Sequence, residues 1–423
     1  MPPPGSEFGR ALTVVLQMDD SVTSQFTGHE AASISRTRQR MDYLDGLRGW
    51  GALMVLMSHL VANCLATQAP YLAYRAGIFR ADVTQGHWAS VSVGLLLRLV
   101  SDGHLAVMIF FTLSGFALSI NQLNSSGRNL PQAAAARYFR LMLPILAASL
   151  LAYAFMAAGL LHNLAAAEAL GRPESWLTLS FRTDPSLLGA LRFALWDVFF
   201  DYQAQASYNS SLWTMPIEML GSIAIYGYLG VYRAAGRVYW RVLGLLTLAL
   251  YGLQPELACF FVGLMLAEEV RGRTGGAAAL RQVATPLRRF APLTVFALAF
   301  AASVFLRGNN WLTSLLAVCI VLGVVHSNLL RGFFSNGLSM FLGRISFPLY
   351  LVHIVFVCSW SAYLLMALPR IGGSEALALA FNFVSTVMIC VAAAVAFLPV
   401  ESFSLTVSKH VARWLTGDVT PPV

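Results

Sequence analysis

The sequence predicts an all-α membrane protein, a polytopic bundle of about ten transmembrane helices. Hydrophobic residues make up 57% of its 423 residues and charged residues only 11%, and the mean hydropathy is +0.65. A soluble globule of this length would need more polar side chains to cover its surface. Apolar segments long enough to cross a hydrocarbon core of about 30 Å recur along the chain. We expect spans at 49–67, 104–121, 137–161, 213–232, 239–252, 255–270, 289–306, 311–328, 345–367 and 376–399.

This pattern divides the chain into three regions. Residues 1–42 are rich in Pro, Ser and Thr, which predicts a disordered N-terminal tail without a cleaved signal peptide. Residues 43–402 are expected to form one membrane domain, followed by a C-terminal tail at 403–423. The short apolar segments within 239–270 leave one re-entrant hairpin open as an alternative to two spans.

The net charge is +8, and the basic residues are distributed unequally between the two sides of the expected membrane. With ten spans, twenty of the 28 Lys and Arg residues lie on the side of both termini and eight on the other side. The positive-inside rule therefore places both termini in the cytoplasm and gives no support to a nucleic-acid partner. The five cysteines lie mostly in apolar segments and form no Cys-x-x-Cys motif, so neither a disulfide framework nor a metal site is expected.

Arg48 and His59 are the most informative pair in the first span. Eleven helical steps bring their side chains back to nearly one face, about 16 Å apart along the axis. With Arg48 at the cytoplasmic surface, His59 lies near the middle of the membrane, where ionisable side chains usually serve a function. A neutral imidazole there can accept a proton from a hydroxyl. The alternative is a histidine that only packs against a neighbouring helix.

Other polar residues are placed to support this site. Asp45 precedes Arg48 by one turn and is expected to pair with it, although a solvated pair at the interface is the alternative. Arg137 and Arg140 share one helical face at the cytoplasmic start of the third span, which suits bidentate phosphate binding. An ordinary positive-inside anchor or a lipid-headgroup contact would explain either arginine alone.

Two further ionisable residues approach the middle of the membrane. Glu218 lies in the fourth expected span, where it would orient His59 or hold an acceptor hydroxyl. His353 lies in the ninth span, where a packed, hydrogen-bonded histidine is an equal alternative to a functional one. Ser114 and Gly115 in the second span form a small face that allows either a helix or an acyl arm to approach closely.

Five motifs together carry a resemblance to a known family. They are Tyr43-Leu-Asp-Gly-Leu-Arg48 followed by ten residues and then His59, Phe110-Phe-Thr-Leu-Ser-Gly-Phe116, Arg137-Tyr-Phe-Arg140, Ser211-Leu-Trp-Thr-Met-Pro-Ile-Glu218 and Leu342-Gly-Arg-Ile-Ser-Phe-Pro-Leu-Tyr-Leu-Val-His353. In this order they resemble the acyltransferase-3 family of integral membrane acyltransferases. Two departures stand out: Met-Pro-Ile-Glu218 replaces the usual Ser-Val-Glu, and Glu401-Ser-Phe replaces the closing Glu-x-Pro.

The resemblance implies that an acyl group, expected to be acetyl, passes from cytoplasmic acyl-coenzyme A to a hydroxyl of a metabolite, lipid or glycan, with no metal. The site residues that follow are His59, Arg48 and Glu218 for catalysis; Arg48, Arg137, Arg140, Ser114 and Gly115 for the donor; and Asp45, Trp213, Tyr350 and His353 for the acceptor or for support of the site. A secondary transporter is the main alternative, because midplane charges and glycine-interrupted spans also suit transport. A non-catalytic scaffold would leave His59 unexplained.

Overall fold

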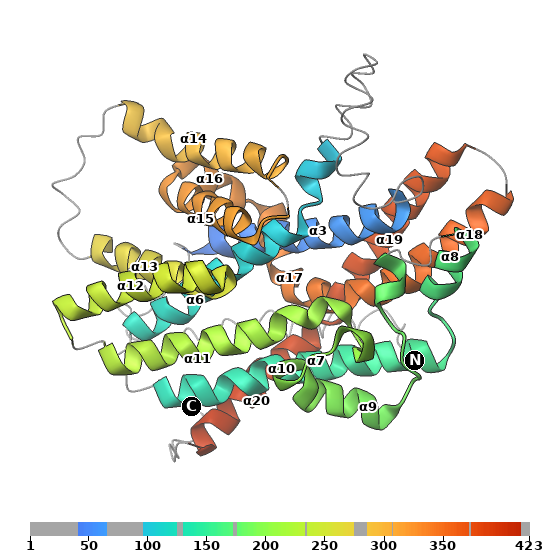
Figure 1. Ribbon diagram of the computed structural model, residues 1–423, viewed down its shortest axis with the longest axis horizontal. Helices are drawn as coiled ribbons and strands as arrows, with labels where there is room; N and C mark the ends of the chain where they lie inside the picture. Colours follow the sequence, from blue (N-terminus) through green and yellow to red (C-terminus); the bar gives the residue numbers. More distant parts are fainter. Residues whose placement is uncertain are drawn as a thin grey trace, which may run out of the picture.

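The computed structural model describes residues 41–65, 96–124, 130–171, 176–232, 235–274, 286–306, 308–371 and 374–415. Within these ranges the chain is α-helical and contains no β-strand, which confirms the predicted fold class (Figure 1). The predicted N-terminal tail, apart from its last two residues, and the end of the chain after residue 415 lie outside the described residues.

Each of the ten expected spans coincides with a helix. These helices are α3 (Asp42–Leu65), α6 (Gly103–Asn124), α7 (Leu130–Ala157), α11 (Met215–Tyr232), α12 (Arg237–Leu253), α13 (Pro255–Thr274), α14 (Pro286–Ser303), α15 (Asn310–His326), α17 (Gly337–Phe356) and α19 (Glu375–Ala396). Among the described residues, four helical segments are long and apolar enough to cross a membrane, and a fifth qualifies if α15 and α16 (Asn328–Phe334) count as one span bent by 97°. In the described part of the chain, four or five segments therefore meet the criteria for a full crossing, which is compatible with ten spans but does not confirm them.

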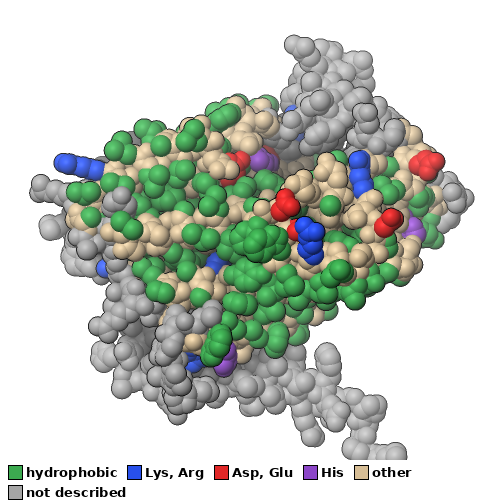
Figure 2. Space-filling model, turned by 60° about the horizontal axis from the view of Figure 1, so that its bottom comes forward, with side chains coloured by type: hydrophobic (Ala, Val, Ile, Leu, Met, Phe, Trp, Pro, Cys, Tyr) green, Lys and Arg blue, Asp and Glu red, His purple; other side chains and the backbone are tan. Residues whose placement is uncertain are grey.

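The outer surface of the bundle is largely apolar. Figure 2 shows hydrophobic side chains over much of the face drawn, with few charged side chains between them. Leu248 of α12, Leu298 of α14 and Leu377 of α19 are 70%, 65% and 72% exposed. Exposure of large apolar side chains on this scale is costly in water and favourable against lipid chains.

The connection between α7 and α11 consists of short helical pieces. They are α8 (Asn163–Ala169), a 3₁₀ turn at Trp176–Leu179, α9 (Leu187–Arg192), a π-helical turn at Phe193–Asp197, α10 (Val198–Phe200) and 3₁₀ turns at Ala204–Ala206 and Ser210–Thr214. The last of these leads directly into α11. It therefore fixes where the first turn of α11, with Glu218, enters the bundle.

The start of the expected C-terminal tail belongs to a further helix. Residues Leu398–Leu415 form helix α20, which lies alongside α7 (Figure 1). Ser404 Oγ donates a hydrogen bond of 3.0 Å to the backbone oxygen of Arg140 in α7. The sequence after residue 402 is amphipathic, with Lys409 and Arg413 on a helix otherwise packed by apolar and small residues, and neighbouring α7 supplies the surface that orders it.

Glycines set the crossing of α3 and α17. A Cβ on Gly49 would lie 2.3 Å from the Gly343 nitrogen, and a Cβ on Gly343 would lie 2.6 Å from the Asp45 oxygen. Gly46 similarly faces Ser339, four residues before Gly343. Residue numbers rise together along both helices at these contacts, so the helices run parallel. Ten residues beyond the Gly49 and Gly343 contact, each helix carries a histidine at the same level.

Glycines also allow the backbones of α6 and α13 to approach closely. A Cβ on Gly115 would lie 2.1 Å from the Phe260 oxygen, and one on Gly263 would lie 2.3 Å from the Thr112 oxygen. Of the two alternatives for the small face at Ser114 and Gly115, the structure shows the close approach of a helix at Gly115.

Candidate active site

His59 of α3 and His353 of α17 form a hydrogen-bonded pair. His59 Nδ1 lies 2.8 Å from His353 Nε2, and the two rings are nearly parallel, with centroids 5.0 Å apart and an interplanar angle of 10°. His353 is 1% exposed, whereas His59 is partly accessible. The partner of His59 is therefore a second histidine, from a helix almost three hundred residues later in the chain.

The surrounding hydrogen bonds assign the tautomers of this pair. His353 Nδ1 lies 3.0 Å from the backbone oxygen of Leu349, and because a carbonyl oxygen only accepts, this nitrogen carries the proton. The Nε2 atom of neutral His353 is then an acceptor, and His59 Nδ1–H donates to it. His59 is left with its lone pair on Nε2. The backbone thus sets, through His353, which atom of His59 is basic.

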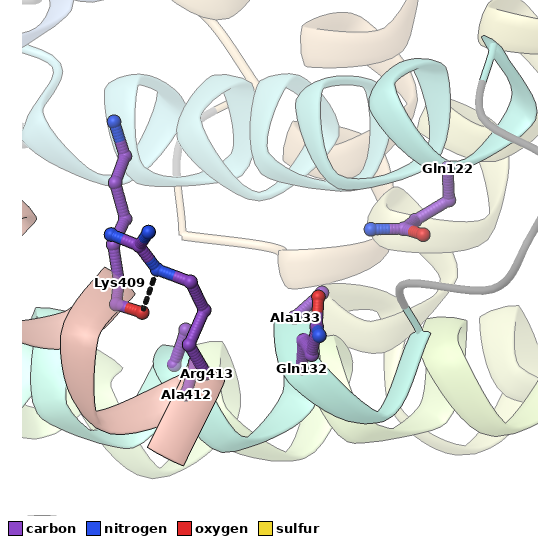
Figure 3. Close-up of a pocket in the computed structure, with 7 residues that line it drawn as sticks. Gln122, Gln132, Ala133, Lys409, Ala412 and Arg413 are labelled. Atoms are coloured by element: carbon purple, nitrogen blue, oxygen red, sulfur yellow. Dashed lines mark hydrogen bonds between the residues drawn. The ribbon is translucent and has the colours of Figure 1, made fainter. Parts of the chain in front are cut away.

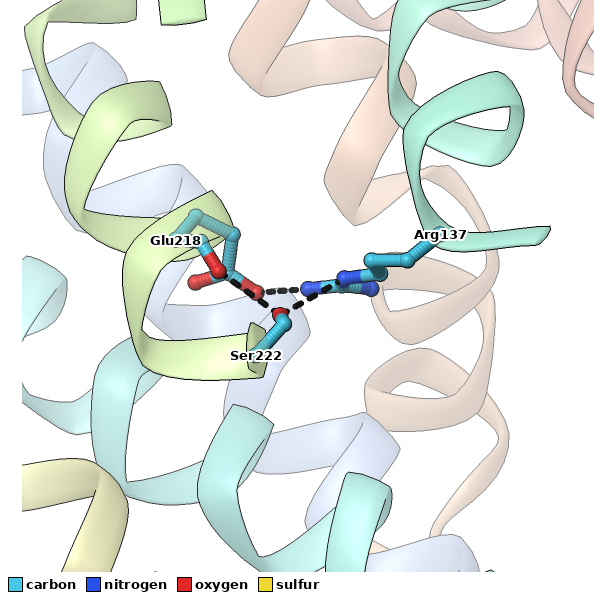
Figure 4. Close-up of polar contacts among 3 residues, drawn as sticks. All are labelled: Arg137, Glu218 and Ser222. Carbon is cyan, nitrogen blue, oxygen red and sulfur yellow. Dashed lines mark hydrogen bonds and ion pairs between the residues drawn. The ribbon is translucent and has the colours of Figure 1, made fainter. Parts of the chain in front are cut away.

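Arg137 of α7 and Glu218 of α11 form an ion pair (Figure 4). Arg137 Nη2 donates to Glu218 Oε1, and Arg137 Nε donates to Ser222 Oγ at 2.8 Å. Ser222 Oγ in turn donates to the Glu218 backbone oxygen at 2.7 Å. The side chains of both charged residues are 11% exposed. Glu218, which the sequence places in reach of His59, is the partner of Arg137 in this structure.

Arg48 and Arg140 lie close to this pair. Arg48 Nη1 donates to Asp45 Oδ1 at 3.1 Å, which is the pairing expected from their spacing. Arg140 is within electrostatic range of Arg48 and Arg137, and also of Glu401 from α20. We call Arg48, Arg137 and Arg140 the arginine cluster. Three guanidinium groups from α3 and α7 converge there, each with a carboxylate nearby.

Tyr350 fixes the segment before α11 against the histidine pair. Its hydroxyl donates to the Ser211 backbone oxygen and lies 2.7 Å from Thr214 Oγ1, which is then the donor to it. The Tyr350 ring is 6.0 Å from the His353 ring. Asn209 Nδ2 adds a 2.7 Å hydrogen bond to the Leu351 oxygen. The turn that carries Trp213 is therefore held next to the histidines.

His104 was not singled out from the sequence. It lies in the first turn of α6, and its ring stacks on Trp213 at a centroid distance of 6.3 Å. Its Nε2 is buried without a hydrogen-bond partner. The neighbouring Gly103 packs against Ser58, since a Cβ there would lie 2.4 Å from Ser58 Oγ. An ionisable residue at the end of an apolar segment was the available signal, but no motif distinguished it.

The site offers no metal centre in the part of the chain that the structure describes. Within those residues, no group of three or more His, Cys, Asp or Glu side chains could hold a metal ion. Among the described residues of this site, ionisable groups instead form a neutral histidine pair and a charged arginine cluster, which together suit proton transfer beside an anion-binding region.

The described residues thus form an apolar helical bundle that holds a histidine pair and a cluster of arginines, as expected for a multi-pass membrane protein with a polar internal site. The acyltransferase domain model matches residues 41–398, which is most of the chain. The chain therefore belongs to the acyltransferase-3 family and is a membrane acyltransferase. Searches of curated proteins and of solved structures give no match.

Proposed function

We propose that the protein transfers an acyl group, with acetyl as the expected group, from cytoplasmic acyl-coenzyme A to a hydroxyl of a metabolite, lipid or glycan. The observation that carries this proposal is the chain of hydrogen bonds from Leu349 through His353 to His59, which leaves His59 Nε2 as a base.

The reaction follows from that base. His59 Nε2 removes the proton of the acceptor hydroxyl while its oxygen attacks the thioester carbonyl. The new ester C–O bond forms, the C–S bond breaks, and the thiolate leaves with the electron pair. The proton on His59 then passes to the thiolate, which gives free coenzyme A. His353 accepts the His59 Nδ1–H throughout and stabilises the transient imidazolium, and the membrane setting limits competition by water.

The donor enters from the cytoplasmic side, where we place both termini from the distribution of Lys and Arg. Its phosphates bind the arginine cluster, because guanidinium groups form strong charged hydrogen bonds with phosphate oxygens. Asp45, Glu218 and Glu401 neutralise these arginines before the donor arrives and keep them oriented. The acceptor lies on the other side of the histidine pair, against Trp213 and Tyr350.

Binding of coenzyme A separates this proposal from transport. The full-length protein in lipid nanodiscs is titrated with acetyl-coenzyme A by calorimetry, and transfer of labelled acetyl to extracts of candidate hydroxylated acceptors is followed by mass spectrometry. We expect saturable binding and a product heavier by one acetyl group. A protein that binds no acetyl-coenzyme A at millimolar concentration, or moves an unmodified solute across vesicles without forming an ester, is not the acyltransferase proposed here.

A further inference from the structure

A groove lies where α6, α7 and α20 meet, away from the histidine pair (Figure 3). Its volume is about 300 Å³. It is lined by Gln122, Gln132, Ala133, Ala136, Lys409, Ala412 and Arg413. None of the described lining residues is acidic, and none belongs to the site residues expected from the sequence.

The groove lies on the same face of α7 as two members of the arginine cluster, Arg137 and Arg140. Ala133 and Ala136 precede Arg137 and Arg140 by four residues each, so that these four residues share one face of the helix. The hydrogen bond from Ser404 to Arg140 sets the antiparallel register of α20 on α7. The lining residues lie four to eight residues before Arg140, so the groove begins about 6 Å and reaches about 12 Å from Arg140 along the axis.

The groove combines positive charge with a flat apolar floor. Lys409 and Arg413 are one helical turn apart, and Arg413 Nε donates to the Lys409 backbone oxygen at 3.4 Å. Figure 3 shows these two side chains at one end and the Gln122 and Gln132 amides toward the other. Ala412 lies beside Arg413 at the first end and Ala133 lies beside Gln132. This arrangement suits a planar ring with an anionic group at one edge and hydrogen-bonding atoms at another.

The length of the C-terminal helical segment places the groove outside the hydrocarbon. Residues Ala376–Trp414 form one helical segment of 39 residues. At 1.5 Å per residue its length is roughly 58 Å, about twice the thickness of a hydrocarbon core of about 30 Å. With α19 crossing the core, the far half of α20 lies in the aqueous phase. A water-soluble occupant therefore fits the groove better than a lipid headgroup.

We propose that this groove binds the nucleotide end of coenzyme A, with Lys409 and Arg413 on its 3′-phosphate and the adenine against the alanines. The diphosphate then reaches the arginine cluster on the same face of α7, and the thioester arm extends toward His59. A volume near 300 Å³ is at the lower limit for sites of small organic ligands and is adequate for one end of an extended molecule. This inference rests on the proposed function, because it assigns part of the donor site.

The 3′-phosphate provides the test. Binding of acetyl-coenzyme A and of its 3′-dephospho analogue to the full-length protein in neutral-lipid nanodiscs is measured by calorimetry. Wild type should prefer acetyl-coenzyme A by roughly tenfold to a hundredfold, which is about the effect of one net charged hydrogen bond. The double variant Lys409→Gln/Arg413→Gln should lose most of this preference and bind the dephospho analogue as wild type does.

A charge-matched control removes two other cations from the same side. Arg241 on α12 and Arg271 on α13 are exposed and do not line the groove. Arg241→Gln/Arg271→Gln should keep the preference for the 3′-phosphate. The control variant could instead lose the preference as fully as the groove variant. The preference would then come from non-specific attraction between the positive charge of the protein and the phosphate, and the assignment of the site would be wrong.

The remaining outcomes are also decisive. Equal binding of both thioesters by wild type, together with acetyl transfer, overturns this inference and leaves the proposed function in place. If neither acetyl-coenzyme A nor its dephospho analogue binds, the proposed function itself is wrong. A last arm adds phosphatidylglycerol to the nanodiscs. The groove is a lipid site, and the inference is wrong, if two results coincide: native mass spectrometry shows that wild type retains this lipid and Lys409→Gln/Arg413→Gln does not, and the lipid abolishes the preference of wild type for acetyl-coenzyme A over its dephospho analogue.

Discussion

The histidine pair and the arginine cluster share helix α3 but are held in different ways. His59 and His353 are placed by glycine contacts between parallel helices and by neutral hydrogen bonds. The arginines are placed by carboxylates, which the proposed polyanionic donor would partly replace. A site for proton transfer needs fixed geometry, because small displacements of a base are costly. A site for a charged donor needs compensated charge in its absence, because a buried unpaired ion is unstable.

The histidine pair should show the largest effect. Replacing His59 with Ala removes the base, so turnover should fall by roughly a hundredfold or more while acetyl-coenzyme A binding stays near wild type. Replacing His353 with Gln, which retains a hydrogen-bonding side chain, should lower turnover less and shift the pH profile of the rate. Initial rates and calorimetry of both variants measure this. Near-normal turnover in folded His59→Ala protein would show that His59 is not the base and serves only in packing.

The arginine cluster should affect the donor instead of the chemical step. Arg140→Ala should weaken acetyl-coenzyme A binding by about 1.5 to 3 kcal/mol, with partial recovery in Arg140→Lys, which keeps the charge but loses the guanidinium fork. Arg137→Ala should do the same and also destabilise the protein, because it leaves Glu218 buried without its partner. Arg137→Ala/Glu218→Gln should recover that stability without recovering the binding. Unchanged donor affinity in both single variants would place the donor phosphates elsewhere.

The glycine crossing should have an intermediate effect. In Gly49→Ala the new Cβ meets the Gly343 backbone, so α3 and α17 must separate and the histidines with them. We expect a loss of stability of about 1 to 3 kcal/mol and a fall in turnover of roughly tenfold. Thermal unfolding and initial rates test this. The control is Gly227→Ala in α11, where a Cβ meets no atom within 4 Å and helix propensity predicts a neutral or slightly stabilising change.

His104 should give the smallest effect, on the acceptor alone. Its buried Nε2 has no partner in the ligand-free protein, which carries a cost of about 1 to 3 kcal/mol that an acceptor hydroxyl would relieve. His104→Phe should keep the stacking on Trp213, raise the melting temperature slightly, and raise KM for the acceptor by roughly fivefold. Donor affinity should not change. A variant with lower stability and an unchanged acceptor KM would show that His104 only packs.

The sequence was sufficient for the helices and for residues that share a helix. Arg48, His59 and the Arg48 to Asp45 pair follow from spacing along α3, because helical geometry relates residues a few turns apart. The partners of His59 and Glu218 cannot be predicted from spacing. His353 and Arg137 come from distant helices, and which helices become neighbours depends on how the entire bundle packs. Helix α20 was missed for a similar reason. Its charged and polar residues suggest a solvated tail, and the helix is stabilised by packing against α7, which the sequence alone does not show.

If the proposed function is correct, helix α3 also sets the length that a donor must span. It carries both Arg48 and His59 on one unbroken helix, so the separation of about 16 Å along the axis between these two residues is fixed. A donor must extend over that length to place its carbonyl at the base while its phosphates remain on the arginines. Short acetyl thioesters lacking a nucleotide would reach His59 without being held, and acetyl phosphate would be held too far from it. The proposed donor site would then select its donor by length as well as by charge.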